Sequence, residues 1–264
     1  GLAKEGKLPV FGTYGVFSSA RNLDQLRVSV SYGDFNVLIV GAHGGVSVGP
    51  DGATHQELEA LFQMCGLPNM KVGVPADSVE TKKMTRAMLF DIPGPKYIRF
   101  AREATPVISD GNTPFQFGVA NIYRFRGEKG SFREAFDVNL STKYKSEKED
   151  LTIVSCGPET PEAMRAAWIL KMEYGIETRV INMHTVKPLD REAIIRAARE
   201  TGAIITAEEH QVGGLGNYVA ATVANEMASI GRAIPFLMIG VKDRFGESGL
   251  PWQLIKEFEL AAEF

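Results

Sequence analysis

One short stretch of the sequence constrains this chain more than any other, because it places ionisable side chains in a glycine-rich turn. Residues 44–57 read Gly-Gly-Val-Ser-Val-Gly-Pro-Asp-Gly-Ala-Thr-His-Gln-Glu. Thr54 and Glu57 stand three residues apart, which predicts a capping box at the start of a helix. Capping accounts for those two residues but not for Asp51, His55 or the density of glycine. The turn therefore predicts a site where a small ligand meets a carboxylate, an imidazole and helix-terminal N–H groups.

Alternating strand-like and helix-like segments along the chain predict an α/β fold. Apolar strand patterns cover residues 36–41, 70–75, 96–101, 151–155, 178–183, 203–207 and 236–241. Helical patterns lie between them, and Asp77 and Asp190 are placed to cap two of these helices. Such alternation is typical of mainly parallel sheets with flanking helices.

The alternation of strand and helix patterns becomes less regular in the middle of the chain, from about Pro106 to Asp150. A structureless loop of that length would be unusual inside a compact protein. We therefore interpret residues 119–150 as an interdomain connection with some local structure. The first domain is then expected over residues 1–118 and the second over residues 151–264.

Composition excludes several classes of function. The formal net charge of −3 gives no electrostatic reason to bind nucleic acid or an anionic membrane surface. No apolar run approaches the length of a membrane span, and no signal peptide opens the sequence. Cys65 and Cys156 are isolated and lack metal-ligand spacing, which favours reduced, buried thiols in a cytoplasmic protein. We expect no metal site on this chain.

The turn resembles the G-x-x-G-x-D-G-x-[ST]-H-Q motif in the pyrimidine-binding domain of transketolases. Further segments resemble transketolase motifs in the same order along the chain: Gly12–Phe17, Ala42–Gly45, Tyr97–Arg102, Met183–Asp190, Glu208–His210 and Lys242–Gly249. The resemblance implies two domains, each a mainly parallel sheet with flanking helices. The first is an incomplete thiamine-diphosphate pyrimidine-binding domain, and the second is a transketolase-type C-terminal domain.

The resemblance also implies an activity, the thiamine-diphosphate-dependent transfer of a two-carbon ketol unit from a ketose phosphate to an aldose phosphate. Such chemistry belongs to carbohydrate metabolism and the pentose phosphate pathway. In this family the cofactor lies between a pyrimidine domain and a diphosphate-binding domain of another chain, whose G-D-G…N motif holds Mg²⁺ or Ca²⁺. The sequence contains no such motif. We therefore expect a diphosphate-binding partner subunit that carries the metal, and a homodimer of this chain within a heterotetramer.

By resemblance, Tyr14 and Phe17 are the cofactor-binding residues, since flat aromatic rings can stack on the aminopyrimidine. Ala20 stands where the family has a third aromatic residue. The structural alternative is that both rings belong to the core. His55 is the expected catalytic residue, because an imidazole can bind or move the proton of the ketol hydroxyl. Asp51 is expected to accept a hydrogen bond from a substrate hydroxyl, or else only to stabilise the turn.

The distal phosphate of the sugar is expected to meet His43 and Arg102, since a guanidinium suits bidentate phosphate binding. Without the resemblance, His43 would be a loop histidine and Arg102 a surface ion-pair partner. Arg99 is the competitor for the phosphate role. In the second domain, Gly213–Gly216 predicts a tight helix entry. Interface or loop hydrogen-bonding roles are expected for His184, Glu208, Glu209, His210 and Arg244.

Three alternatives stay open at this point. One is another thiamine-diphosphate enzyme, either a deoxyxylulose-phosphate synthase, which tends to have a second histidine where Gln56 stands, or a pyruvate dehydrogenase beta-like subunit. Another is a non-catalytic transketolase-like partner. The third concerns the segment Gly1–Lys7, which reads as the tail of a helix. In transketolases a similar segment follows a catalytic glutamate, so we expect either that residues carrying this glutamate precede the segment or that the chain is a truncated product. The resemblance implies the C-terminal subunit of a split transketolase, and a piece of a longer polypeptide is the alternative.

Overall fold

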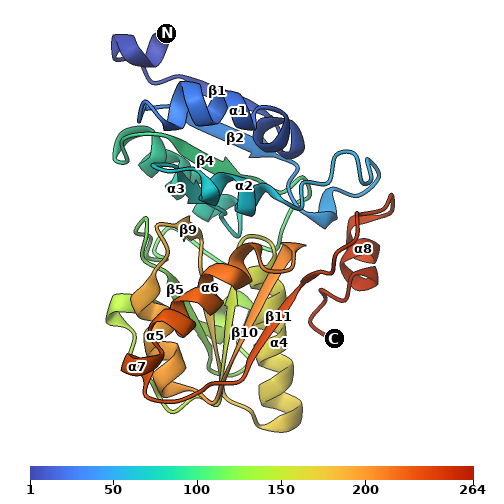
Figure 1. Ribbon diagram of the computed structural model, residues 1–264. Coiled ribbons are helices and arrows are strands. Elements are labelled where there is room, and N and C mark those ends of the chain that lie inside the picture. Colours follow the sequence, from blue (N-terminus) through green and yellow to red (C-terminus); the bar gives the residue numbers. More distant parts are fainter.

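The computed structural model describes residues 1–264 and contains two β-sheets, one beyond the other along the molecule (Figure 1). Helices flank both sheets, and most neighbouring strands run parallel. The predicted α/β fold with two mainly parallel sheets is therefore confirmed. None of the helices combines the length and apolar character needed to cross a membrane.

The first sheet has five strands in the order β1-β2-β4-β3-β9. Their bounds are β1 Val10–Tyr14, β2 Leu38–Ala42, β3 Lys71–Gly73, β4 Lys96–Arg99 and β9 Thr185–Lys187. The first four run parallel, whereas β9 comes from the second half of the chain and pairs antiparallel with β3. Because β1, β2 and β4 are parallel neighbours, the loops that follow them meet at one edge of the sheet.

The two faces of the first sheet are covered by α2 (Ala60–Gly66) and α3 (Ser78–Phe90). Successive residues of β2 point to opposite faces, so Ile39 packs in the cluster of α2 and Leu38 in that of α3. Asp77 caps α3 through the Glu80 backbone N–H, as the sequence predicts. The shorter helical segments here are η1 Leu2–Glu5, η2 Phe17–Arg21, α1 Leu23–Leu26, η3 Arg27–Ser31 and η4 Val46–Val48.

The second sheet has six strands in the order β11-β10-β7-β8-β5-β6. Their bounds are β5 Asn121–Phe125, β6 Phe136–Leu140, β7 Leu151–Ser155, β8 Thr178–Asn182, β10 Ala203–Gln211 and β11 Phe236–Val241. The four strands from β11 to β8 run parallel, and β5 and β6 extend the sheet in antiparallel fashion.

Helices lie on both faces of the second sheet. The helical segments in this half of the chain are η5 Arg133–Ala135, η6 Ser141–Lys143, α4 Glu159–Tyr174, α5 Arg191–Glu200, α6 Gly214–Asn225, α7 Met227–Ile230 and α8 Pro251–Glu257. Val154 packs with the buried faces of α5 and α6, whereas its neighbour Ile153 packs with α4. Asp190 caps α5 through Ala193 N, as predicted, and Gly175 ends α4 in a left-handed conformation.

Residues 119–150 contain two strands of the second sheet rather than only a connection. β5 pairs with β8, and β6 pairs with β5. The strands were hard to predict because Arg124 lies inside β5 and is nonetheless buried. The division at residues 118 and 150 stays a proposal, and the pairing favours assigning this middle segment to the second domain.

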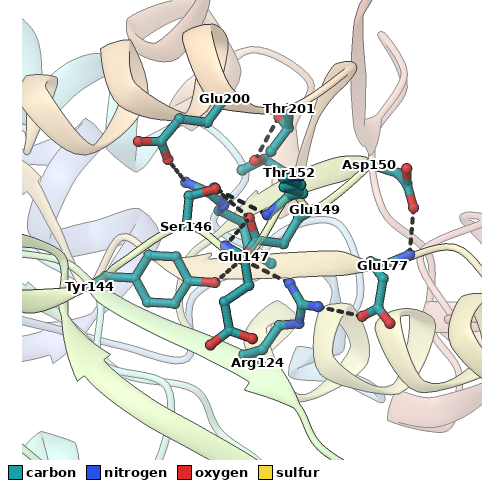
Figure 2. Close-up of polar contacts among 12 residues, drawn as sticks. Arg124, Tyr144, Ser146, Glu147, Glu149, Asp150, Thr152, Glu177, Glu200 and Thr201 are labelled. Atoms are coloured by element: carbon teal, nitrogen blue, oxygen red, sulfur yellow. Dashed lines mark hydrogen bonds and ion pairs between the residues drawn. The ribbon is translucent and has the colours of Figure 1, made fainter.

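Burial of Arg124 is possible because a carboxylate at the end of the same segment faces it. Figure 2 shows Arg124, Tyr144 and Ser146 directed toward Glu149. The Arg124 guanidinium lies 2.8 Å from Glu149, and Arg179 of β8 lies 2.6 Å from the other oxygen of the same carboxylate. Burial raises the pKa of Glu149, but Tyr144 and Arg179 outweigh this effect and hold it at about 2.

The two sheets share one continuous apolar core. Leu61 of α2, Val186 of β9 and Leu215 of α6 belong to the same buried cluster, which therefore crosses from one sheet to the other. A separate cluster joins Val46, within the glycine-rich turn, and Leu58, directly after it, to α8. Both Cys65 and Cys156 are free and buried, as expected.

Candidate active site

The predicted site residues lie at the edge of the first sheet where β1, β2 and β4 end. Tyr14 is the last residue of β1, and its partner in the register is Ala42, which immediately precedes His43. Arg99 ends β4 opposite Gly41, so Arg102 emerges from the neighbouring loop. Parallel pairing therefore brings three loops of distant sequence to one place.

Four of the predicted residues form a cluster of rings at this edge. The Tyr14 ring centroid lies 4.3 Å from that of His43 and 5.7 Å from that of His55. Phe17 follows in η2, 6.0 Å from Tyr14, and meets the His55 ring edge-on at 5.2 Å. Tyr14 keeps 39% of its surface exposed, and Phe17, His43 and His55 are half-buried. These rings are therefore accessible and do not belong to the closed core.

Asp51 and Arg102 border this ring cluster on the solvent side. Both side chains are exposed. Arg102 Nη1 donates a 2.7 Å hydrogen bond to the Val48 carbonyl, which holds the arginine against the glycine-rich turn. The charges of Arg102 and Asp51 both affect the pKa of His43. The cluster is therefore bordered by one cation and one anion. All six predicted residues thus surround one region of the surface.

His43 is the most constrained member of the cluster. Its backbone has φ of 61°, a left-handed conformation that is uncommon for residues other than glycine. Its Nδ1 atom is buried without a hydrogen-bond partner. Burial, followed by the charge of Arg102, lowers the pKa of His43, while Asp51 raises it. His43 is therefore a neutral imidazole at pH 7.

The predicted capping box is wrong. No helix begins at Thr54, since α2 starts at Ala60 and Glu59 occupies its N-cap. Thr54 Oγ1 instead lies 2.9 Å from His55 Nδ1, which orients the imidazole. The glycine-rich segment forms a compact turn in place of the expected first turn of a helix. A hydrogen bond from His55 N to Gly52 O closes this turn.

Glu57, which the spacing assigns to a capping box, is a buried carboxylate beside Gly15. Tyr97 Oη donates to both of its oxygens, at 2.8 and 3.0 Å. Burial raises the pKa of Glu57 to about 7. A Cβ atom at Gly15 would lie only 2.0 Å from Glu57 Oε2. Glycine is therefore required at this position beside Tyr14. No sequence signal pointed to this contact.

Arg99 cannot compete with Arg102 for a ligand, because it is fully buried. Its Nη2 lies 2.5 Å from Oε1 of Glu209 in β10, whose side chain is also 0% exposed. The second oxygen of Glu209 accepts the backbone N–H of Ser47 at 3.1 Å. The sequence did not predict this pairing, because the two residues are far apart in the chain and charged residues are ordinarily expected at the surface.

The glycine-rich turn before α6 forms a tight helix entry, as predicted. Glu208 accepts the backbone N–H groups of Gly213, Leu215 and Gly216, so an internal carboxylate already occupies the helix N-terminus. His184 is likewise internal, stacks on Phe115 at 4.8 Å, and has a pKa lowered to about 4 by burial. Arg244 packs over the Phe258 ring on the surface.

The residues present suit one half of a thiamine diphosphate site. Exposed aromatic faces and the unpartnered Nδ1 of His43 fit a flat heterocycle with polar edges. No group of three or more His, Cys, Asp or Glu side chains could hold a metal ion. The pyrimidine side of such a site therefore fits the residues of this chain.

Comparison with known proteins agrees with this geometry. Residues 1–107 match the transketolase pyrimidine binding domain, and residues 141–263 match the transketolase C-terminal domain. A putative transketolase C-terminal section of Methanocaldococcus jannaschii is 36% identical over the whole chain, which spans 74% of that relative. The chain belongs to the transketolase family. Membership implies dependence on thiamine diphosphate.

Other members of the family extend this comparison. The 6-deoxy-6-sulfo-D-fructose transketolase subunit SqwH of a Clostridium species is 35% identical over the whole chain, which covers 73% of that subunit. A solved structure described as a split gene transketolase, an inactive beta4 tetramer, superposes with a TM-score of 0.80. It is 36% identical, and the match covers 99% of this chain and 75% of that one.

Proposed function

We propose that this chain supplies the pyrimidine side of a ketol-transfer active site. The reaction moves a two-carbon ketol unit from a ketose phosphate to an aldose phosphate with thiamine diphosphate. One observation carries the proposal: Tyr14, Phe17, His43 and His55 form an accessible ring cluster with Arg102 at its border. The chain contributes half of the site, and a diphosphate-binding subunit contributes the other half with Mg²⁺ or Ca²⁺.

Thiamine diphosphate, when bound, supplies the carbanion chemistry of the ketol unit. Tyr14 and Phe17 offer the faces on which the aminopyrimidine stacks. His55 acts on the ketol hydroxyl: Thr54 engages its Nδ1 atom, so Nε2 is the nitrogen left to hold or move a proton. Asp51, exposed at the tip of the turn, accepts a hydrogen bond from a substrate hydroxyl.

The distal phosphate of the sugar is read by Arg102 and His43. Arg102 uses one Nη atom to bind Val48 and presents its remaining donors to solvent, where a phosphate can accept them. His43 stays neutral at pH 7 because burial and Arg102 lower its pKa, so it can donate one hydrogen bond without a charge of its own. A sulfonate would satisfy the same donors, and the relative named for a sulfo-sugar makes this anion the second candidate.

The proposed assembly is a heterotetramer in which two copies of this chain pair with two diphosphate-binding subunits. We propose that it acts in the cytoplasm, in the pentose phosphate pathway. The inactive beta4 tetramer of the solved relative supports the need for a second kind of subunit.

The test is reconstitution of this chain with a diphosphate-binding subunit, thiamine diphosphate and Mg²⁺. Ketol transfer from a ketose phosphate to ribose 5-phosphate is the expected result, with no carbon dioxide released from pyruvate. Turnover of pyruvate would favour the other thiamine-diphosphate enzymes. Cofactor binding by the complex without any turnover would favour a non-catalytic partner.

A further inference from the structure

One buried ion pair joins the two sheets beside the loop of residues 44–48. Arg99 ends β4 in the first sheet, and Glu209 lies in β10 of the second. Both side chains are 0% exposed, and their charged atoms are 2.5 Å apart. Every other buried ion pair between an arginine and a glutamate joins residues within the second sheet or its flanking segments.

The loop that carries His43 is shaped around this pair. A Cβ at Gly45 would lie 2.1 Å from Arg99 Nη2 and 2.3 Å from Glu209 Cδ, and one at Gly44 would lie 2.2 Å from Arg99 Nε. Only glycine allows the backbone to approach so closely. Residues 44 and 45 therefore follow the surface of the ion pair.

Glu209 also holds the far end of this loop directly. Its Oε2 atom accepts the Ser47 N–H at 3.1 Å, while Oε1 binds Arg99. The next residue, Val48, is the one whose carbonyl accepts the hydrogen bond from Arg102. One carboxylate thus lies against Gly45, two residues after His43, and against Ser47, one residue before the carbonyl that holds Arg102.

We propose that Glu209 is a positioning residue for the phosphate end of the substrate site. Through Ser47 and Arg99 it fixes residues 44–48, and so sets the distance between His43 and Arg102. The C-terminal domain would then act on substrate binding without touching the substrate. The inference rests on the proposed function, because it assumes that these two residues read the distal anion.

Two variants test the proposal in the complex with the diphosphate-binding subunit. Glu209→Gln weakens the pair but leaves Arg99 buried and less well neutralised. Arg99→Met combined with Glu209→Met removes both charges, which avoids an uncompensated buried ion and preserves volume. The matched control is Glu149→Gln, which disrupts an equally buried arginine pair in the same domain, away from the loop.

We expect Glu209→Gln and the Arg99→Met, Glu209→Met double variant to raise the KM for ribose 5-phosphate about tenfold. The KM for an unphosphorylated aldose should change little. Hydrogen–deuterium exchange of the peptide covering residues 43–49 should become faster in both. The control should leave the KM values and the exchange of this peptide unchanged, even if its melting temperature falls.

The proposal is overturned if the double variant exchanges residues 43–49 at the wild-type rate, or if the control alters the KM values as Glu209→Gln does. If the wild-type complex shows no ketol transfer, the proposed function fails by itself. The exchange experiment then still decides whether Glu209 holds the loop, because it needs no turnover.

Discussion

Replacing Arg102 by alanine should separate phosphate recognition from the rest of the site. The side chain is exposed and makes one hydrogen bond to the protein, to Val48 O at 2.7 Å. Losing such a bond costs about 0.5–1.5 kcal/mol, so the fold should survive. A hydrogen bond to a charged phosphate contributes about 1.5–3 kcal/mol, which corresponds to a roughly 10- to 150-fold loss in kcat/KM. Solvent at this exposed position favours the lower half of that range.

The assay compares phosphorylated and unphosphorylated aldoses as acceptors for the reconstituted complex. The variant should lose activity on the phosphorylated acceptor alone, since the other acceptor never makes the contact. Arg86→Ala is the matched control, because Arg86 lies over the Phe90 ring on α3 and takes no part in the site. Equal losses on both acceptors would refute the reasoning and assign Arg102 to the fold or the cofactor.

A second measurement on Arg102→Ala needs no substrate. The charge of Arg102 lowers the pKa of His43, and that of Asp51 raises it. The imidazole pKa of His43, followed by NMR of labelled histidine, should therefore rise in Arg102→Ala and fall in Asp51→Asn. Shifts of the same sign in both variants would show that these groups do not surround His43 as described.

Three further predictions concern the proton-transfer residue, the cofactor and the stability of the second sheet. His55→Ala should lower turnover by about 10²–10⁴-fold. Its circular dichroism spectrum should match that of the wild type, because His55 makes no buried contact on which the fold depends. An unchanged turnover rate would show that His55 has only a structural role. This chain alone should bind thiamine diphosphate weakly in calorimetry, since the proposed function assigns the diphosphate and its metal to the partner subunit. Tight binding without a partner would contradict the proposed half-site. Glu149 has a pKa of about 2 in the folded protein against 4.5 ordinarily, so its stabilisation is complete above about pH 4.5 and is lost as pH falls toward 2. Urea unfolding of Glu149→Gln should show a loss of about 3–5 kcal/mol at pH 7 and a shallower decline in acid; a wild-type acid profile would contradict this assignment.

The sequence was sufficient to predict seven of the eleven strands, because local patterns carried the necessary information. Buried parallel strands read as short apolar runs, and Asp77 and Asp190 marked helix starts that the structure contains. Strand β5 was missed for a physical reason. Arg124 is polar in sequence but is buried in the fold, since Glu149 and Glu177 neutralise it from later segments.

The motif at residues 44–57 predicted the location of the site, but the spacing of its residues did not predict its local backbone geometry. Thr54 and Glu57 matched a capping box, yet glycine allowed a compact turn, and Glu57 turned inward to meet Tyr97. A capping box depends only on neighbouring residues, whereas this contact depends on a strand far along the chain.

The sequence by itself determined the family, the alternation of strands and helices in both domains, and the six residues expected at the site. Only the tertiary structure decided that Tyr14, Phe17, His43 and His55 share one accessible cluster, because parallel pairing of β1, β2 and β4 brings their loops to the same edge. It also decided that Arg99 is internal while Arg102 faces solvent. The difference between these two arginines is the presence of Glu209, a buried carboxylate from the other sheet, and contacts between residues so far apart leave no periodic pattern in the sequence.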